Sequence, residues 1–204
     1  MKSFKSLISE SFDYEKNPPK KTVKGYKLFR KKDDKIYPLF VDRNKPVETG
    51  KWLSAEAGPK GKRTGSVKSS LGDLAYRPGW HSGDLPVATH IGGKSKVGLK
   101  GPDYRPDNHV WAEVEHPADV DWQSEANKRA RVSNGKPVAS TAHITDQVPH
   151  GGHYRYKTNP NMTGNWIISG GMKVNRILSD KEVQDINAKH GVADLPRLNK
   201  QKAR

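Results

Sequence analysis

Short runs of alternating apolar and polar residues recur along most of the chain, and this alternation predicts β-strands. The clearest run covers 109–115, where positions 110, 112 and 114 are apolar and share one face of the expected strand. Glu113 and Glu115 share the other face. Further strands are expected at 23–30, 36–41, 51–55, 153–157, 166–169 and 172–178. The strands at 23–30 and 36–41, joined by a turn at Asp33-Asp34, are expected to form a hairpin.

Three segments have the apolar spacing of helices. Residues 1–12 predict one or two amphipathic turns, and 121–132 predict a second helix that Asn134-Gly135 would end. The third begins at Ser179 with a capping box completed by Glu182, and Gly191 ends it. The expected fold class is α+β, with a small, twisted, mostly antiparallel sheet, two or three helices and many loops.

Composition sets the domain organisation. The chain has 204 residues and only 32% hydrophobic residues, so one small core is expected. We expect a flexible N-terminal arm at 1–21, one domain at 22–196 and a basic tail at 197–204. Cysteine is absent, which excludes disulfides and thiol chemistry. No apolar run reaches the ~18 residues that span a membrane, and residues 1–12 lack the apolar core of a secretory signal, so no membrane partner is expected.

Positive charge is concentrated near the start of the expected domain. The formal net charge is +15, and 16–35 holds nine Lys or Arg and two Asp. Such a block predicts binding of nucleic acid or another polyanion through phosphate contacts, although a solvated charged surface is the alternative. The candidate contacts in this block are Lys20, Lys21, Lys24, Lys27, Lys31, Lys32 and Lys35.

A second candidate group is the run from Tyr154 to Lys157. In a strand, Tyr154 and Tyr156 lie on one face, and Arg155 and Lys157 lie on the other. An exposed tyrosine face beside cations could stack bases, as single-strand binders do. The alternative is that the tyrosines belong to the core and the cations face water.

The Gly- and Pro-containing loop at 76–81 is a candidate ligand pocket. Tyr76, Arg77, Trp80 and His81, with Asp84 nearby, supply aromatic, cationic and imidazole groups of the kind that line such pockets. The loop could equally cover the core, with Trp80 as its plug. The segment 58–70, which has four Lys or Arg and no acidic residue, is expected to be an exposed loop.

The remaining polar motifs indicate little chemistry. Glu113 and Glu115 could act as an acid–base pair, but more often such a pair meets Lys or Arg on a neighbouring strand. His150 and His153 are separated by two glycines and lack a third ligand, so we expect no metal. The chain has no G-x-G-x-x-G, Walker or serine-elbow motif.

Two resemblances add expectations. The opening Met1–Glu10 resembles the start of many small proteins of marine T-even-like tailed phages, and Ile8-Ser9-Glu10 resembles the pattern cut by the prohead protease. Segments 74–84, 110–115 and 166–180 resemble a family of small phage proteins without an assigned function. This resemblance implies a viral origin, a location in the host cytoplasm or the virion, and phage head proteins as partners.

The second resemblance concerns an enzyme family. ADP-ribosyltransferases of the Arg–Ser–Glu type carry a strand-borne Arg, a strand-borne Ser and a Glu-x-Glu strand, and Arg30, Ser54 and Glu113-Val114-Glu115 follow that order. The resemblance implies NAD as a cofactor: Arg30 would grip it, Ser54 would orient the nicotinamide ribose, and the glutamates would stabilise an oxocarbenium-like transition state. A basic phage accessory protein that binds nucleic acid, without a cofactor, is the leading hypothesis. The alternatives are this enzyme, acting on host proteins, and a structural virion protein.

Overall fold

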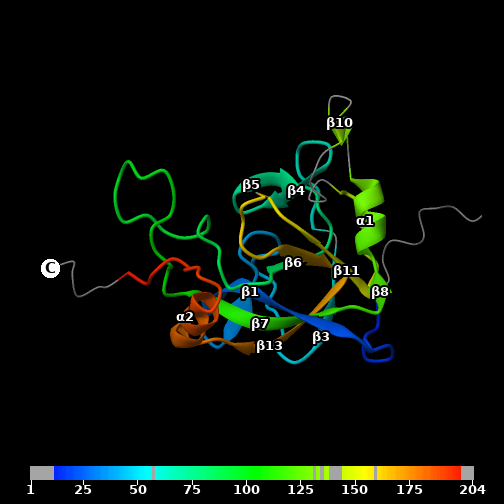
Figure 1. Ribbon diagram of the computed structural model, residues 1–204, viewed down its shortest axis with the longest axis horizontal. Helices are drawn as coiled ribbons and strands as arrows, with labels where there is room; N and C mark the ends of the chain where they lie inside the picture. Colours follow the sequence, from blue (N-terminus) through cyan, green and yellow to red (C-terminus); the bar gives the residue numbers. More distant parts are fainter. Residues whose placement is uncertain are drawn as a thin grey trace, which may run out of the picture.

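The computed structural model describes residues 12–56, 58–130, 132–133, 136–137, 144–158 and 160–198. Nine strands form one mixed sheet in the order β3-β13-β7-β1-β6-β12-β11-β8, with β2 attached to β1 (Figure 1). They are β1 (Thr22–Lys32), β2 (Lys35–Tyr37), β3 (Trp52–Ser54), β6 (Trp80–Gly83), β7 (His109–Pro117), β8 (Val120–Asp121), β11 (Gly152–Tyr156), β12 (Trp166–Ser169) and β13 (Gly171–Ile177). Two small sheets pair β4 (Ser66–Ser69) with β5 (Gly72–Ala75) and β9 (Val132–Ser133) with β10 (Lys136–Pro137).

The expected α+β class is wrong: the protein is mostly β, with 37% strand and 9% helix. The described residues contain two short helices, α1 (Gln123–Arg129) and α2 (Asp180–Ala188). Helix α1 is shorter than predicted. No side chain caps its first turn, at Trp122, and the backbone of Ala130 leaves the helical conformation at the other end. Only Ala126 of this helix is buried, so packing adds little to its stability. The segments expected as loops at 58–70 and 76–81 instead supply β4 and the start of β6. Of the helix predicted at 1–12, all but the last residue lies outside the described residues.

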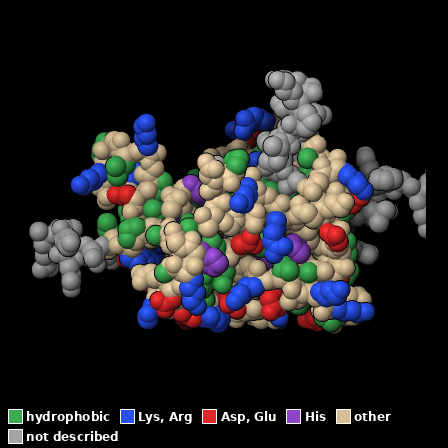
Figure 2. All heavy atoms as spheres, in the orientation of Figure 1, with side chains coloured by type: hydrophobic (Ala, Val, Ile, Leu, Met, Phe, Trp, Pro, Cys, Tyr) green, Lys and Arg blue, Asp and Glu red, His purple; other side chains and the backbone are tan. Residues whose placement is uncertain are grey.

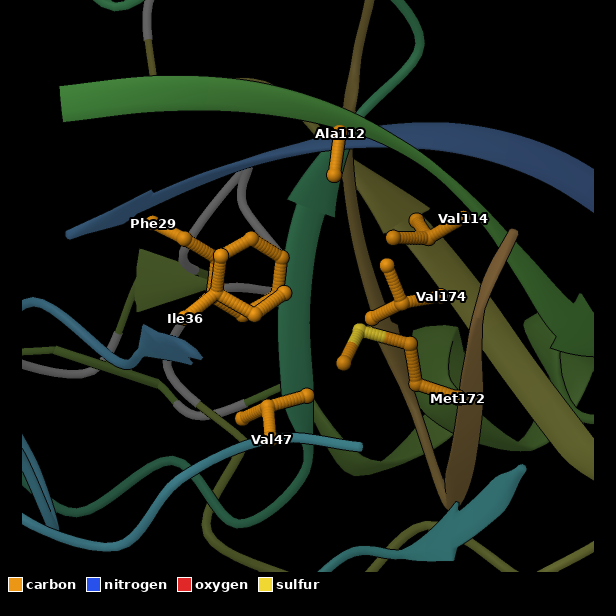
Figure 3. Close-up of a cluster of buried hydrophobic side chains, with 7 residues drawn as sticks. All are labelled: Phe29, Ile36, Val47, Ala112, Val114, Met172 and Val174. Carbon is orange, nitrogen blue, oxygen red and sulfur yellow. The ribbon is translucent and has the colours of Figure 1, made fainter. Parts of the chain in front are cut away.

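The predicted alternation in 109–115 is confirmed and builds the main core. Val114 and Ala112 of β7 point to one face, where they meet Phe29 from β1 and Met172 and Val174 from β13. Figure 3 shows these side chains converging, with Ile36 and Val47 closing the far side of the cluster. Removing so many apolar groups from water is the main stabilising contribution to the domain.

The two helices cover separate parts of the sheet. The capping box predicted for α2 is confirmed, because Ser179 accepts a hydrogen bond from the Glu182 amide while the Glu182 side chain accepts one from the Ser179 amide. Val183 of this helix packs with Tyr26 and Trp111 in a second apolar cluster. A third cluster lies beneath α1 and includes both tyrosines of β11. The helices accordingly lie on opposite sides of the view in Figure 1.

The sheet has a break between β1 and β6. Strand β1 pairs with β7 over nine consecutive residues but meets β6 only at Tyr26, opposite Gly83. Its partner on that same edge becomes β2, from Arg30 onwards. The edge of β1 at residues 27–29 therefore has no neighbouring strand, and this break positions the candidate site.

The described part of the N-terminal arm packs against the sheet. Tyr14 is buried, and its hydroxyl donates a hydrogen bond to the His150 carbonyl at 2.5 Å. The Tyr14 hydroxyl occupies the space above Gly171, where any Cβ would collide with it. Phe12 stacks on His150, with ring centroids 4.8 Å apart. Residues 12–14 thus form a strap across the end of β13.

Candidate functional site

A cavity of about 750 Å³ opens at the break between β1 and β6. This volume lies in the range of pockets that hold small molecules or single nucleotides. Its walls are rich in aromatic side chains from both faces of the sheet, since Tyr26 and Trp111 belong to the cluster beside α2 and Trp80 packs against the main core. The principal ones are Tyr26, Tyr76, Trp80, Trp111, Tyr156 and Trp166.

Lys27 extends into this cavity from the unpaired edge of β1. Its Nζ donates a hydrogen bond to the carbonyl oxygen of His81, at 2.5 Å, and lies 5.6 Å from the ring centroid of Trp80 and 5.7 Å from that of Phe29. Within the part of the chain that the structure describes, no carboxylate forms an ion pair with it. Burial lowers the pKa of Lys27 to about 8, because the protein replaces the water that would solvate the ammonium.

The loop that leads into β6 forms the opposite wall. Gly79 has a φ of +139° and approaches Ile168 and Ser169 so closely that no Cβ would fit, which explains glycine at this turn. His81 Nε2 lies 2.9 Å from the Arg77 carbonyl oxygen, so this nitrogen carries the ring proton. Arg77 and Lys27 are the cations of the cavity wall that lack a carboxylate partner among the described residues.

A buried ion pair holds the back wall. Arg105 and Asp194 are almost fully buried and form a bidentate pair, with distances of 2.6 and 3.2 Å. The Asp194 carboxylate also accepts hydrogen bonds from the Trp111 indole at 2.7 Å and from the Ala88 amide at 3.0 Å. Arg105 in turn donates to the carbonyls of Ala88 and Ile91. These contacts attach the cavity-lining segment 88–91 to β7 and to the C-terminal segment.

Below the cavity lies a buried polar chain. Ser169 donates to the Gly171 carbonyl at 2.7 Å, so it must accept from His116 Nδ1–H, 2.6 Å away. His116 Nε2 then accepts from Ser82, also at 2.6 Å. Burial lowers the pKa of His116 to about 3, which makes it a weak base. We interpret the chain as internal support for β6, since each polar atom in it has a partner.

The basic block predicted as one phosphate-binding surface is divided by the fold. Lys20 and Lys21 lie just before β1, and their backbone amides donate hydrogen bonds to the Asp119 carboxylate. Lys24 forms an ion pair with Glu113 at 3.4 Å. Lys27 lies in the cavity. The exposed residues Lys31, Lys32 and Lys35 lie at the other end of β1, around the turn to β2.

On β11 the structure matches the alternative in which the tyrosines belong to the core and the cations lie on the other face. Tyr154 and Tyr156 are buried beneath α1, and burial raises the pKa of both hydroxyls. Tyr156 also lines the cavity. Arg155 pairs with Asp84 at 3.2 Å, and Lys157 is exposed beyond the end of the strand.

The four predicted pocket residues meet at one place. Tyr76, Arg77, Trp80 and His81 all line the cavity. Trp80 also packs against the main core and donates its indole hydrogen to the carbonyls of Leu53 and Ser54, both at 3.1 Å. Trp80 is therefore both a wall of the cavity and part of the core, the two roles between which the sequence could not decide.

The residues of the ADP-ribosyltransferase resemblance are not brought together. In the β1–β7 register Arg30 lies opposite His109 and Glu115 opposite Lys24. Six residues of strand, about 20 Å at ~3.3 Å per residue, therefore separate the arginine from the glutamate. The Arg30 guanidinium donates to the Arg43 carbonyl at 2.7 Å, and Ser54, on the cavity wall, donates to the Phe12 carbonyl at 2.9 Å.

Glu113 and Glu115 form ion pairs with strand neighbours. Glu115 lies 2.8 Å from Lys173, and this contact lowers its pKa; Glu113 lies between Lys24 and Arg176. Figure 2 shows the result along the lower edge of the molecule, where acidic and basic side chains lie side by side over β7 and β13.

Among the described residues, no group of three His, Asp or Glu side chains could hold a metal ion. None of the described helices has the length and apolar character needed to cross a membrane.

Comparisons of the chain with protein-family models, with curated proteins and with solved structures find no match.

The sequence predicted Lys27 only as one of seven phosphate contacts in the basic block and gave no sign that it enters a cavity. Its place opposite the apolar Ala112 in the register marks it as inward-facing. The ion pair of the back wall was missed altogether. Arg105 and Asp194 are 89 residues apart, so nothing local links them. The Trp-rich composition was the available signal, because a cavity with several indole walls needs polar partners for their N–H groups.

Proposed function

We propose that this protein binds single-stranded nucleic acid and takes one nucleotide into the cavity between β1 and β6. The observation that carries the proposal is the combination, in one cavity, of aromatic walls with two cations that lack carboxylate partners. Bases stack on aromatic side chains in a sequence-tolerant way, at about 1–3 kcal/mol per base. Phosphate groups of the bound strand would give Lys27 and Arg77 the negatively charged partners that neither side chain has in the unbound protein.

The segment that borders the cavity supports a longer contact. Gly58 and Val67 line the cavity, and between 58 and 69 the chain has four Lys or Arg and no Asp or Glu. The side chains of Lys60, Lys62 and Lys68 are exposed. Phosphates on either side of the bound nucleotide could be neutralised there, which would make affinity fall with salt.

Binding of a fluorescent single-stranded oligonucleotide tests the proposal through two matched triple variants. Lys60, Lys62 and Lys68 replaced by Glu should lose most of the affinity and reduce the salt dependence. Lys31, Lys32 and Lys35 replaced by Glu make the same charge change at the β1–β2 turn and should bind almost as the parent protein does. Equal losses in both variants would instead indicate a nonspecific response to net charge.

A second measurement addresses the cavity itself. Arg77→Gln removes one cation without touching the border segment and should weaken binding by roughly tenfold, the loss of one charge-assisted contact. Indole fluorescence should change on binding, because a base would stack near Trp80 or Trp166. An unchanged affinity together with unchanged fluorescence would contradict the placement of a nucleotide in the cavity.

A further inference from the structure

We propose that Lys27 is a nucleophile that forms an imine with the aldehyde of a phosphorylated sugar. Resting on the proposed function, the inferred source of this aldehyde is an abasic nucleotide within a bound strand. A free sugar phosphate presents the same chemistry, and the experiment below distinguishes the two sources.

The geometry of Lys27 is that of an available amine. Lys27 lines the cavity, and the hydrogen-bond acceptor of its Nζ is a neutral carbonyl, that of His81. The nearest rings are those of Phe29 and Trp80, which carry no formal charge. An amine that is bound to a carboxylate is held as ammonium, whereas one in such surroundings can lose its proton and attack.

Comparison with other strand lysines supports this assignment. Lys24 and Lys173 face Glu113 and Glu115 at 3.4 and 2.8 Å. The pKa of Lys24 is raised by Tyr26 and Glu113, whereas burial lowers that of Lys27 to about 8. At neutral pH a useful fraction of Lys27 is therefore the free amine that imine formation requires.

The cavity also explains why an abasic unit would react. In an intact nucleotide the base occupies the anomeric carbon, so no aldehyde exists and the base can only stack on the aromatic walls. Without the base, the open sugar exposes an aldehyde and leaves room for it to approach Lys27. The neighbouring Arg77 can hold a phosphate of the same unit, as arginines commonly do.

The reaction balances without a cofactor. Nζ of Lys27 attacks the aldehyde carbon and forms a C–N bond; the two amine hydrogens and the aldehyde oxygen then leave as one water molecule, which gives the imine. Loss of a proton from the adjacent carbon to solvent breaks the C–O bond one carbon further on and expels the phosphate. Water finally hydrolyses the imine and restores the amine.

Borohydride trapping is the direct test. The full chain would be incubated with an abasic oligonucleotide or with ribose 5-phosphate, reduced, digested and mapped by mass spectrometry. We expect a Lys27 adduct at least about tenfold more abundant than that of any other lysine, because an activated amine reacts selectively. Lys27→Arg should lose the adduct, whereas Lys24→Arg, outside the cavity, should keep the adduct and still bind an oligonucleotide with a tetrahydrofuran abasic analogue.

The outcomes separate this inference from the proposed function. A Lys27 adduct with the abasic oligonucleotide supports both. An adduct only with ribose 5-phosphate, without oligonucleotide binding, supports the nucleophile and overturns nucleic acid as its source. Oligonucleotide binding without a Lys27 adduct from either reagent overturns the nucleophile and leaves the proposed function standing. Adducts spread evenly over the lysines of the parent protein also overturn the assignment of Lys27 as the nucleophile, and this result can be obtained without any substitution.

Discussion

Lys24 and Lys27 lie three residues apart on the same strand, but β1 presents them to opposite faces of the sheet. Lys24 belongs to a charged face on which each cation meets a carboxylate of β7. Lys27 enters a cavity where its neighbours are aromatic rings and a backbone carbonyl. The first environment raises the lysine pKa and the second lowers it.

The difference shows how little the net charge says about function. On the paired face the formal charges largely cancel, and screening by salt makes each exposed pair worth about 0–1 kcal/mol. On the cavity side a few unpaired or buried cations dominate the local electrostatics, because little water surrounds them. The cavity side is therefore where substitutions should have large effects.

The largest effect is expected at the back wall of the cavity. Arg105→Met would leave Asp194 buried without its partner, which typically costs about 3–5 kcal/mol. Arg176→Met, on the paired face, should cost no more than about 1 kcal/mol. Urea unfolding of the two variants beside the parent protein measures both values, and similar losses would remove the contrast between the buried ion pair at the cavity wall and the exposed pairs of β7.

The two lysines can be compared directly. NMR titration of the lysine side chains should place the pKa of Lys27 near 8 and that of Lys24 above its ordinary value, so more than two pH units should separate them. Lys27→Met assigns the low-pH signal by abolishing it. Coincident titrations would show that the cavity does not desolvate Lys27.

Acid should destabilise the cavity side through His116. The pKa of His116 in the folded protein, about 3, lies below its ordinary value of 6.5. Between these two pH values the unfolded chain therefore binds a proton at His116 that the folded protein does not bind. Stability should therefore fall as the pH falls through this window, by up to about 1.4 kcal/mol per pH unit. His116→Gln should reduce the dependence of the unfolding free energy on pH in this window, and an unchanged dependence would contradict the role of His116.

The smallest effect is expected on the paired face. Glu113→Gln removes the carboxylate shared by Lys24 and Arg176 and should cost about 0.2–1 kcal/mol, less at high salt. Thermal unfolding at low and high salt measures this loss. A loss of several kcal/mol that salt leaves unaffected would mean that this face is as tightly coupled as the cavity wall.

Local patterns in the sequence determined much of the fold. The strands at 109–115, 153–157, 166–169 and 172–178 and the capped helix α2 follow from alternation and capping chemistry, and the structure confirms them. These features depend on residues within a few positions of one another, so the sequence can be interpreted directly. The same patterns grouped Tyr76, Arg77, Trp80 and His81 as one candidate pocket, although Trp80 and His81 lie in β6 and not in a loop.

Only the tertiary structure decided where the site lies and which cations serve it. The cavity exists because β1 leaves β6 after Tyr26 and pairs with β2 from Arg30, a choice set by long-range strand pairing. The same pairing neutralises Lys24 and isolates Lys27, and it separates Arg30 from Glu115. Pairing partners are distant in sequence, and the environment of a charge depends on those partners, so its pKa and its function follow from the fold.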